Sequence, residues 1–390
     1  MRIAILTSGI MPVPAIKGGA VENLIDFYLE YNNQQKLHDI TVYSVWHPDV
    51  EIHSAQKSKV NHYKYIKMDG WWIKVKKSFY KKTHREGYYH YSIEYFLHKA
   101  IKKIRYKHFD IIIVENRPGF ILSLPKSINT KYILHLHNDF LNIDSPHATD
   151  IYKRFHLIIN VSDYIKNRVN QLEVNNPKTI TVYNAIDVQM FYDSIPLKRE
   201  NIGIDKDDFV VVYSGRLNEE KGILQLIQAM KLLHQIPNIK LLIIGASNYG
   251  IDANPTPFTK QLEKEAESIK NRIVFTGFIN YKSVPSYLKM ADIAVVPSMW
   301  EEPFGLTIIE AMAAGLPLIT TRSGGIPEIC EGIATIVEKE NIVDNLATAI
   351  KDLYVHPEKR EQIKMSSLTH SNYYNKQRYS EDFFKALGKI

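Results

Sequence analysis

The sequence predicts an α/β protein built from two doubly wound, Rossmann-like domains. Three observations support this prediction. The chain has 390 residues, which is too long for one ordinary hydrophobic core. Short apolar runs alternate with segments of helical periodicity, the pattern of βαβ units and parallel sheets. A polar stretch without periodicity, residues 188–204, interrupts this alternation and is expected to link the two domains.

The composition is that of a soluble globular protein, with 45% hydrophobic and 23% charged residues. A single cysteine, Cys330, excludes a disulfide framework and fits a reducing cytosol. No apolar run approaches the length of a membrane span, and the strand-like start Arg2–Leu6 leads us to expect no secretory signal. The net charge of +7 favours anionic partners such as nucleotides, anionic lipid or nucleic acid.

The first domain is expected to cover residues 1–190. Apolar runs predict strands at residues 3–7, 40–45, 110–115, 131–139, 157–162 and 179–183. The first of these leads through a Pro/Gly loop to Gly18 and Gly19, before a helix over residues 20–31. Two adjacent glycines before a helix let the backbone approach a phosphate closely, although an ordinary flexible loop explains the pair equally well.

Residues 57–107 differ in kind from the rest of this domain. Aromatic residues alternate with lysines in Trp71–Lys82, and a second basic group follows at residues 99–107. This mixture favours contact of residues 71–107 with an anionic membrane surface. The alternative is a solvated basic face whose aromatic residues belong to the core.

Polar residues end the strand that begins at Lys131. Ligands of doubly wound sheets bind outside the carboxyl ends of the strands, so His137 is a candidate ligand-binding residue. His135 lies inside the strand and is expected to be a core residue. We predict no metal site, because these two histidines have no third ligand expected nearby. The acidic pair Asp205 and Asp207 is interpreted as a cap before a strand.

The second domain is expected to cover residues 191–372. It opens with a strand over residues 208–214 and a turn from Gly215 to Gly222, followed by a helix. Arg216 and Lys221 stand at the mouth of this turn, where cations can neutralise a diphosphate. The alternative is two ordinary surface cations. Further strands are predicted at residues 240–245, 273–277, 293–297 and 318–321, and a helix at 341–354.

The most informative turn joins the strand at 293–297 to the next helix. Backbone N–H groups of Phe304, Gly305 and Leu306, together with the helix dipole, form a site for an anion. Glu302 and Glu310 flank this site. Phosphate repels a carboxylate, so these glutamates are better suited to accept hydrogen bonds from sugar hydroxyls. The alternative is that both merely favour the first half of a helix.

The stretch EPFGLTIIEAMAAGLP, residues 302–317, resembles the E-x(7)-E signature of the retaining GT-B glycosyltransferases of family four. The turn GRLNEEKG at 215–222 and the turn NAID at 184–187 resemble the same family, although Ala185 replaces the usual glycine. The resemblance extends over nearly the whole chain. It implies the GT-B fold, in which two Rossmann-like domains face each other across a cleft and a C-terminal helix, here residues 373–390, crosses back onto the first domain.

The resemblance also implies an activity. A hexose would move from a nucleotide diphosphate sugar, with UDP expected, to a hydroxyl of a glycan or lipid-linked acceptor. The anomeric configuration would be retained, and no metal or other cofactor would be needed. The expected setting is bacterial-type surface polysaccharide or glycoconjugate synthesis, in the cytoplasm or at the inner face of the cell membrane. The alternatives are another GT-B enzyme, an epimerase or phosphorylase, and a basic nucleic-acid-binding protein.

The family's functional residues map onto matching positions of this chain. Arg216 and Lys221 would stabilise the departing diphosphate, and Glu302 would hold sugar hydroxyls. His137 would bind the sugar from the first domain, and Glu310 would bind the ribose. The residues expected to contact the donor are Gly18, Gly19, Gly215, Ile279, Phe304, Gly305, Leu306 and Glu310. The loop over residues 246–257 is expected to vary with the donor.

Overall fold

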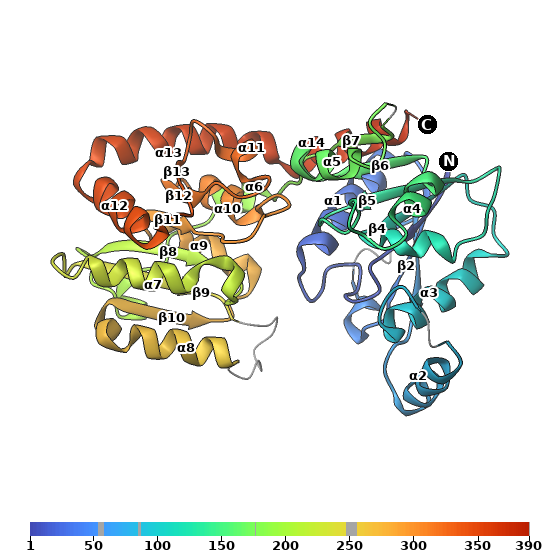
Figure 1. The fold of residues 1–390 in the computed structure, drawn as a ribbon, viewed down its shortest axis with the longest axis horizontal. Helices are drawn as coiled ribbons and strands as arrows, with labels where there is room; N and C mark the ends of the chain where they lie inside the picture. Colours follow the sequence, from blue (N-terminus) through green and yellow to red (C-terminus); the bar gives the residue numbers. More distant parts are fainter. Residues whose placement is uncertain (54–57, 85–86, 176, 247–255, 390) are drawn as a thin grey trace. The chain divides into compact units, whose positions relative to one another are not determined.

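The computed structural model describes residues 1–53, 58–84, 87–175, 177–246 and 256–389. The chain forms two compact units. The first unit contains Met1–Asn184 and Lys376–Ile390, and the second contains Ala185–Asn375. Each unit is built around its own parallel sheet with helices beside it (Figure 1). The predicted α/β class with two Rossmann-like units is therefore confirmed.

The first unit has a seven-stranded sheet in the order β3-β2-β1-β4-β5-β6-β7. Its strands are β1 (Arg2–Leu6), β2 (Asp39–Val45), β3 (Asn61–Ile66), β4 (Ile111–Glu115), β5 (Lys131–Leu136), β6 (Leu157–Asn160) and β7 (Thr179–Thr181). Their apolar runs are buried, as expected for parallel strands covered on both faces. The strand order reverses at β1, which pairs with β2 on one side and β4 on the other. Ligands bind at such a reversal in open α/β sheets.

The helices of the first unit include the end of the chain. They are α1 (Ala20–Gln35), α2 (Trp71–Thr83), α3 (Tyr91–Ile104), α4 (Ala148–Arg154), α5 (Asp163–Asn170) and α14 (Lys376–Leu387), with 3-10 turns η1 (Pro48–Val50) and η3 (Pro118–Leu122). Most of them lie beside this sheet, whereas α2 packs against α3 and away from the sheet (Figure 1). Helix α14 packs on α1, where the Tyr28 and Phe383 rings stack with their centroids 4.1 Å apart. The last helix is therefore part of the first unit's core.

The second unit has a six-stranded sheet in the order β10-β9-β8-β11-β12-β13. Its strands are β8 (Phe209–Ser214), β9 (Ile239–Ile244), β10 (Ile273–Gly277), β11 (Ile293–Val296), β12 (Leu318–Thr321) and β13 (Thr335–Val337). Its helices are α6 (Val188–Tyr192), α7 (Ile223–Leu232), α8 (Pro257–Ala266), α9 (Val284–Lys289), α10 (Leu306–Ala313), α11 (Ile326–Cys330), α12 (Ile342–Val355) and α13 (Pro357–Ser371), with 3-10 turns η4 (Arg199–Ile202), η5 (Glu219–Lys221), η6 (Glu267–Arg272), η7 (Tyr281–Ser283) and η8 (Asn372–Tyr374). Strands β8 and β11 are neighbours at the order reversal, so the turns after them lie together.

The polar segment at residues 188–204 is packed against the second unit and contains α6 and η4. The Lys289 ammonium donates to the Tyr192 and Ser194 carbonyls at 2.7 and 2.8 Å. The Leu197 N–H donates to the Ser286 carbonyl at 2.9 Å. Polar contacts hold this segment in place. Because such contacts leave no hydrophobic periodicity in the sequence, the segment resembled a linker.

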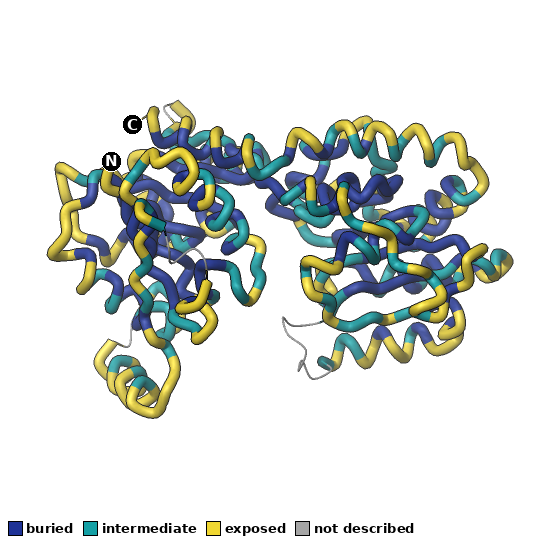
Figure 2. Tube along the Cα trace, turned by 180° about the vertical axis from the view of Figure 1, so that it is seen from behind, coloured by how far each residue is buried: buried dark blue, intermediate teal, exposed yellow. Residues whose placement is uncertain are grey.

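Helix α2 is largely exposed (Figure 2). The side chains of Trp71, Trp72 and Phe79 are 66%, 67% and 69% exposed. The alternative in which the aromatic residues of this basic segment belong to the core is therefore wrong for these three. Within the described ranges, no helix combines the length and the apolar character needed to cross a membrane.

Candidate functional site

A lysine and a buried glutamate meet in the second unit, beside the turn after β11. Lys221 Nζ lies 2.5 Å from Glu302 Oε1, and the Ser298 hydroxyl donates to the same oxygen. The Glu302 side chain is only 8% exposed, and that of Lys221 is 19% exposed. The Lys221 ammonium also lies over the Trp300 ring, 5.2 Å from its centroid. The fold thus joins two predicted site residues that are 81 positions apart.

The start of α10 lies next to this ion pair in sequence and space. Gly305 takes the N-cap position with φ 109°, a left-handed conformation that favours glycine. No side chain caps the helix. The Ile308 N–H donates to the Gly305 carbonyl at 3.0 Å. The capacity to bind an anion therefore belongs to the N–H groups of Leu306 and Thr307 at the start of the helix. Phe304 is buried against the Tyr374 ring, and Leu306 is half-buried at the first helical position.

Glu310 is buried one turn inside α10. Burial raises the pKa of its carboxyl to about 7, against the opposing effect of a hydrogen bond with the Tyr281 hydroxyl. Burial and the Glu310 charge in turn raise the pKa of Tyr281 well above its usual value. The carboxyl of Glu310 is therefore divided between its acid and carboxylate forms at neutral pH. This protonation behaviour was not expected from the sequence.

The turn after β8 places Arg216 at the surface and Lys221 against Glu302. Gly222 has φ 70°, and a Cβ at this position would lie 1.9 Å from the Pro297 carbonyl oxygen. A Cβ on Gly245 would lie equally close to the carbonyl oxygen of Gly215. The glycines therefore allow the backbones of three strand ends to approach one another closely.

The remaining predicted turns of this unit lie at neighbouring strand ends. Ile279 is half-buried in the turn after β10. In the turn after β12, the Gly325 N–H donates to the Glu302 carbonyl at 2.8 Å, and a Cβ on Gly324 would lie 2.2 Å from that oxygen. This glycine pair thus supports the backbone of Glu302. Residues 247–255 of the loop expected to vary with the donor lie outside the described residues.

In the first unit, the predicted Gly18–Gly19 pair lies between β1 and α1. Both glycines are half-buried and left-handed, with φ 74° and 109°. A Cβ on Gly19 would lie 2.3 Å from Glu22 Oε2. Glu22 is itself buried, which raises the pKa of its carboxyl to about 7. The sequence reasoning missed Glu22, although it stands three residues after the glycine pair.

His137 follows β5 and is held by Glu115 at the end of β4. Nε2 of His137 lies 2.9 Å from Glu115 Oε2, and Nδ1 of His135 lies 3.1 Å from the same oxygen. All three side chains are buried. The expectation that no third group lies near the two histidines is therefore wrong. In the register of the sheet Glu115 pairs with His135, so neighbouring parallel strands bring the three groups together.

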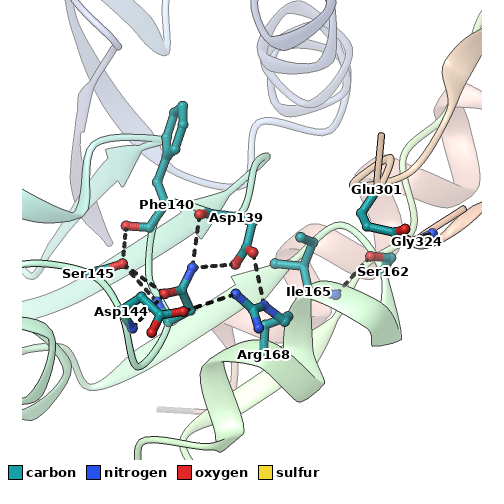
Figure 3. A network of polar contacts seen from close by, with 10 residues as sticks. Asp139, Phe140, Asp144, Ser145, Ser162, Ile165, Arg168, Glu301 and Gly324 are labelled. Atoms are coloured by element: carbon teal, nitrogen blue, oxygen red, sulfur yellow. Dashed lines mark hydrogen bonds and ion pairs between the residues drawn. The ribbon is translucent and has the colours of Figure 1, made fainter. Parts of the chain in front are cut away.

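The loop after His137 is fixed by a polar network (Figure 3). The Asp139 carboxylate accepts a hydrogen bond from Arg168 Nε on α5 at 2.9 Å, and a second carboxylate, Asp144, lies 3.7 Å from the same guanidinium. Ser145 donates to the Phe140 carbonyl at 3.3 Å. This network orders the chain immediately after the candidate histidine.

The two halves of the chain match two family models. The model described as "Glycosyltransferase Family 4" matches residues 32–190. The model described as "Glycosyl transferases group 1" matches residues 194–367. The boundary between the two matches lies close to the boundary between the two structural units.

The chain is also similar to known proteins over its full length. It is 28% identical over 408 residues to Spore coat protein SA of Bacillus subtilis (strain 168), with 100% of each chain covered. It is 27% identical over 388 residues to Putative glycosyltransferase YtcC of the same organism, covering 95% of this chain and 87% of the relative. Its fold is similar to the crystal structure of Anabaena HepE in complex with UDP, with a TM-score of 0.73, 19% identity and 100% of each chain covered. Given both family matches and these relatives, the chain belongs to the group 1 glycosyltransferases of family four, which have the GT-B fold.

Proposed function

We propose that this chain transfers a hexose from a nucleotide diphosphate sugar, with UDP as the nucleotide, to a hydroxyl of a glycan or lipid-linked acceptor. The observation that supports the proposal most is the Lys221–Glu302 pair beside the uncapped start of α10. One place thus offers a cation for phosphate and a carboxylate for sugar hydroxyls. The UDP complex of the Anabaena protein supports the choice of nucleotide.

In this proposal, binding of the donor separates the Lys221 ammonium from the Glu302 carboxylate. The diphosphate competes with Glu302 for the Lys221 ammonium, and sugar hydroxyls then donate to the carboxylate. Ser298 remains hydrogen-bonded to Glu302, so the buried carboxylate keeps a partner throughout. Binding of the donor therefore exchanges one charge-assisted contact for two.

The difficult step is departure of the diphosphate, which gains negative charge as its bond to the sugar breaks. In this proposal, Arg216, Lys221 and the N–H groups at the start of α10 stabilise that charge. We propose that the acceptor hydroxyl attacks from the same face that the diphosphate leaves, which retains the anomeric configuration. The acceptor oxygen then forms the new bond and transfers its proton to the leaving diphosphate.

We propose that this reaction needs no metal. Arg216 and Lys221 would neutralise the diphosphate, as a metal ion does in other enzymes. Asp205 and Asp207 are exposed in the turn before β8, and the Asp205 N–H donates to the Asp208 carboxylate at 3.0 Å. The carboxylate that accepts in this turn is that of Asp208, and the capping role of Asp205 and Asp207 stays a prediction. Activity should therefore persist in excess chelator.

Helix α2 supports a membrane-associated acceptor. It carries Trp71, Trp72 and Phe79 exposed, and it contains five lysines and no acidic residue. Exposed aromatic side chains can enter the lipid interface, and each lysine contributes about 1 kcal/mol near an anionic surface. We propose a cytoplasmic enzyme that docks on the inner face of the membrane and acts in surface glycoconjugate synthesis.

Incubation of the purified full-length chain with a panel of UDP- and GDP-sugars tests the activity. We expect release of UDP from at least one UDP-sugar, faster with added glycan or lipid-linked acceptor and unchanged by EDTA. An anomer-resolved NMR spectrum of the product should show retention. Absence of nucleotide binding and of turnover across the panel would contradict the proposal.

The same panel separates the other GT-B activities. An epimerase would interconvert sugar nucleotides without accumulation of a glycosylated acceptor. A phosphorylase would require inorganic phosphate and would form a sugar phosphate. Chromatography of the products therefore distinguishes the three reactions in one experiment.

A further inference from the structure

Glu115 is the centre of a buried polar cluster in the first unit. Its side chain is fully buried and its two oxygens accept hydrogen bonds from three directions. The Tyr28 hydroxyl donates to Oε1 at 2.8 Å. His137 Nε2 lies 2.9 Å from Oε2, and His135 Nδ1 lies 3.1 Å from it. None of the sequence patterns drew attention to this carboxylate.

In each of the two imidazoles, one ring nitrogen contacts Glu115 and the other does not. His137 Nδ1 and His135 Nε2 are buried and have no hydrogen-bond partner within the described part of the chain. A histidine that binds a metal almost always gives its second ring nitrogen to a carboxylate or carbonyl. In this cluster the carboxylate instead faces the nitrogens that would bind the metal, and the second nitrogens lack acceptors. The arrangement fits a hydrogen-bonded cluster better than a metal centre.

The protonation state of His137 follows from its contact with Glu115. Burial alone would raise the pKa of Glu115, but the two histidines outweigh burial and lower it to about 2. The carboxylate can therefore only accept, so Nε2 of His137 must carry the hydrogen. Burial and the neighbouring His135 lower the pKa of His137 to about 4, so the ring is neutral at neutral pH. Its Nδ1 is then an acceptor.

We propose that Glu115 is a positioning residue that holds His137 as the neutral Nε2–H tautomer and reserves Nδ1 to accept a hydrogen bond from a hydroxyl of the transferred sugar. The proposal rests on the proposed function and specifies how His137 would bind the sugar. A buried acceptor without a partner is costly, and a sugar hydroxyl offers the missing donor. His137 then orients the sugar and does not act as an acid.

The tautomer is measurable without any activity. The full-length chain is labelled with ¹⁵N-histidine, and the His137 signals are assigned by their loss in His137→Asn. At pH 7 we expect a protonated Nε2 and an unprotonated Nδ1 in the ligand-free protein. In Glu115→Gln the two tautomers should mix, because an amide can donate as well as accept. A wild-type Nδ1–H tautomer, an imidazolium, or a stoichiometric metal in the purified protein would overturn the proposal.

Kinetics distinguish positioning from a merely structural role. Glu115→Gln should lower kcat for the donor sugar about tenfold, the effect of one hydrogen bond, and leave the Kd of free UDP unchanged. Glu94→Gln is the matched control, because its carboxylate accepts a hydrogen bond from the Tyr89 N–H at 2.8 Å on another part of the same unit. It should leave kcat and Kd unchanged.

Two results would overturn the proposal at this stage: equal kcat in Glu115→Gln and wild type, or an equal loss in both variants. If Glu115→Gln fails to fold, the wild-type tautomer still decides the question. Failure of the proposed function would appear separately, as absence of turnover in the wild-type chain with the expected tautomer intact.

Discussion

At the scale of single residues, the contact between Lys221 and Glu302 changes how both should be understood. The sequence assigns one to the diphosphate and the other to the sugar, as if they acted separately. The 2.5 Å contact makes each the partner of the other before the donor binds. Removing either residue therefore also leaves a buried or half-buried charge without the opposite charge beside it, which is a larger change than the loss of one ligand contact.

The first prediction separates the two cations. Lys221→Ala should lower kcat on the order of a hundredfold, because the lysine faces charge that grows as the diphosphate leaves. Arg216→Ala should lower kcat as well, but only Lys221→Ala also removes the partner of buried Glu302 and should reduce thermal stability. Steady-state kinetics and melting curves measure both effects. Retention of full kcat in either variant would contradict the assigned roles.

The second prediction concerns Glu310. Its proposed partner is a neutral ribose, whose charge does not change during the reaction. Glu310→Gln should therefore raise the donor KM more than it lowers kcat. Because the pKa of Glu310 is about 7 and its carboxylate is the stronger acceptor, the wild-type KM should fall as pH rises through 7. The variant should lose this trend, and a pH-dependent KM in Glu310→Gln would contradict the prediction.

At the scale of elements, the sequence identified strands well and polar contacts between strands poorly. Apolar runs bounded by turn residues predicted strands close to β1, β4, β8 and β11, because burial on both faces requires such runs. The Glu115–His137 contact was missed because it depends on which strands are neighbours. The signal was present, since the predicted strand at 110–115 ended in Glu115 and the next one, at 131–139, ended in polar residues that include His137. A β4–β5 pairing places such ends side by side.

The third prediction belongs to α2. The full-length chain should sediment with anionic liposomes and should not sediment with neutral ones. Changing Lys74, Lys76 and Lys82 to Glu should abolish most of this binding, because it reverses the charge beside the exposed aromatic residues. The control changes three exposed lysines of the second unit, Lys264, Lys270 and Lys282, to Glu, and it therefore has the same net charge as the α2 variant. Equal loss in both variants would show that net charge, and not α2, governs the binding.

The fourth prediction concerns the start of α7. Gly222→Ala should destabilise the chain by several kcal/mol, because it combines a left-handed φ with a Cβ 1.9 Å from the Pro297 carbonyl oxygen. Gly203→Ala is matched, since Gly203 has φ 76° in the same unit and nothing within 4 Å of its Cβ. Gly203→Ala should lower the free energy of unfolding by only about 1 kcal/mol. Urea denaturation measures the difference, and equal losses would show that φ strain alone accounts for both.

At the scale of the whole molecule, the sequence indicated the family and the two-unit fold but not the ionisation of its buried acids. Family and fold follow from motifs and hydrophobic patterns that can be recognised directly in the amino-acid sequence. The pKa of a carboxyl follows from what surrounds it in three dimensions. Glu22, Asp26 and Glu310 come from both units, and burial raises the pKa of each to about 7.

These three carboxyls predict how stability changes with pH. Between about pH 4.5 and 7 the folded chain holds more protons on them than the unfolded chain does. Their contribution to the free energy of unfolding is therefore fully present below about pH 4.5 and is lost as pH rises through 7. Glu115 and His137 act in the opposite direction, because their lowered pKa values, about 2 and about 4, favour the folded chain as pH rises through the acidic range. Of these five groups, only the three raised carboxyls still change charge above pH 6.5, so their contribution to stability should fall between pH 6.5 and 8.5.

The fifth prediction isolates one of these groups. Glu310→Gln removes a buried group that must ionise at high pH and replaces it with a neutral side chain of the same shape. At pH 8.5 the variant should be more stable than the wild type by about 1–3 kcal/mol, and at pH 5 the difference should be much smaller. Exposed Glu263 on α8 supplies the control, because Glu263→Gln should change stability little at either pH. Urea denaturation of all three proteins at both pH values measures this. A Glu310→Gln variant less stable than the wild type at pH 8.5 would mean that the carboxylate is stabilised in place and that burial does not dominate its pKa.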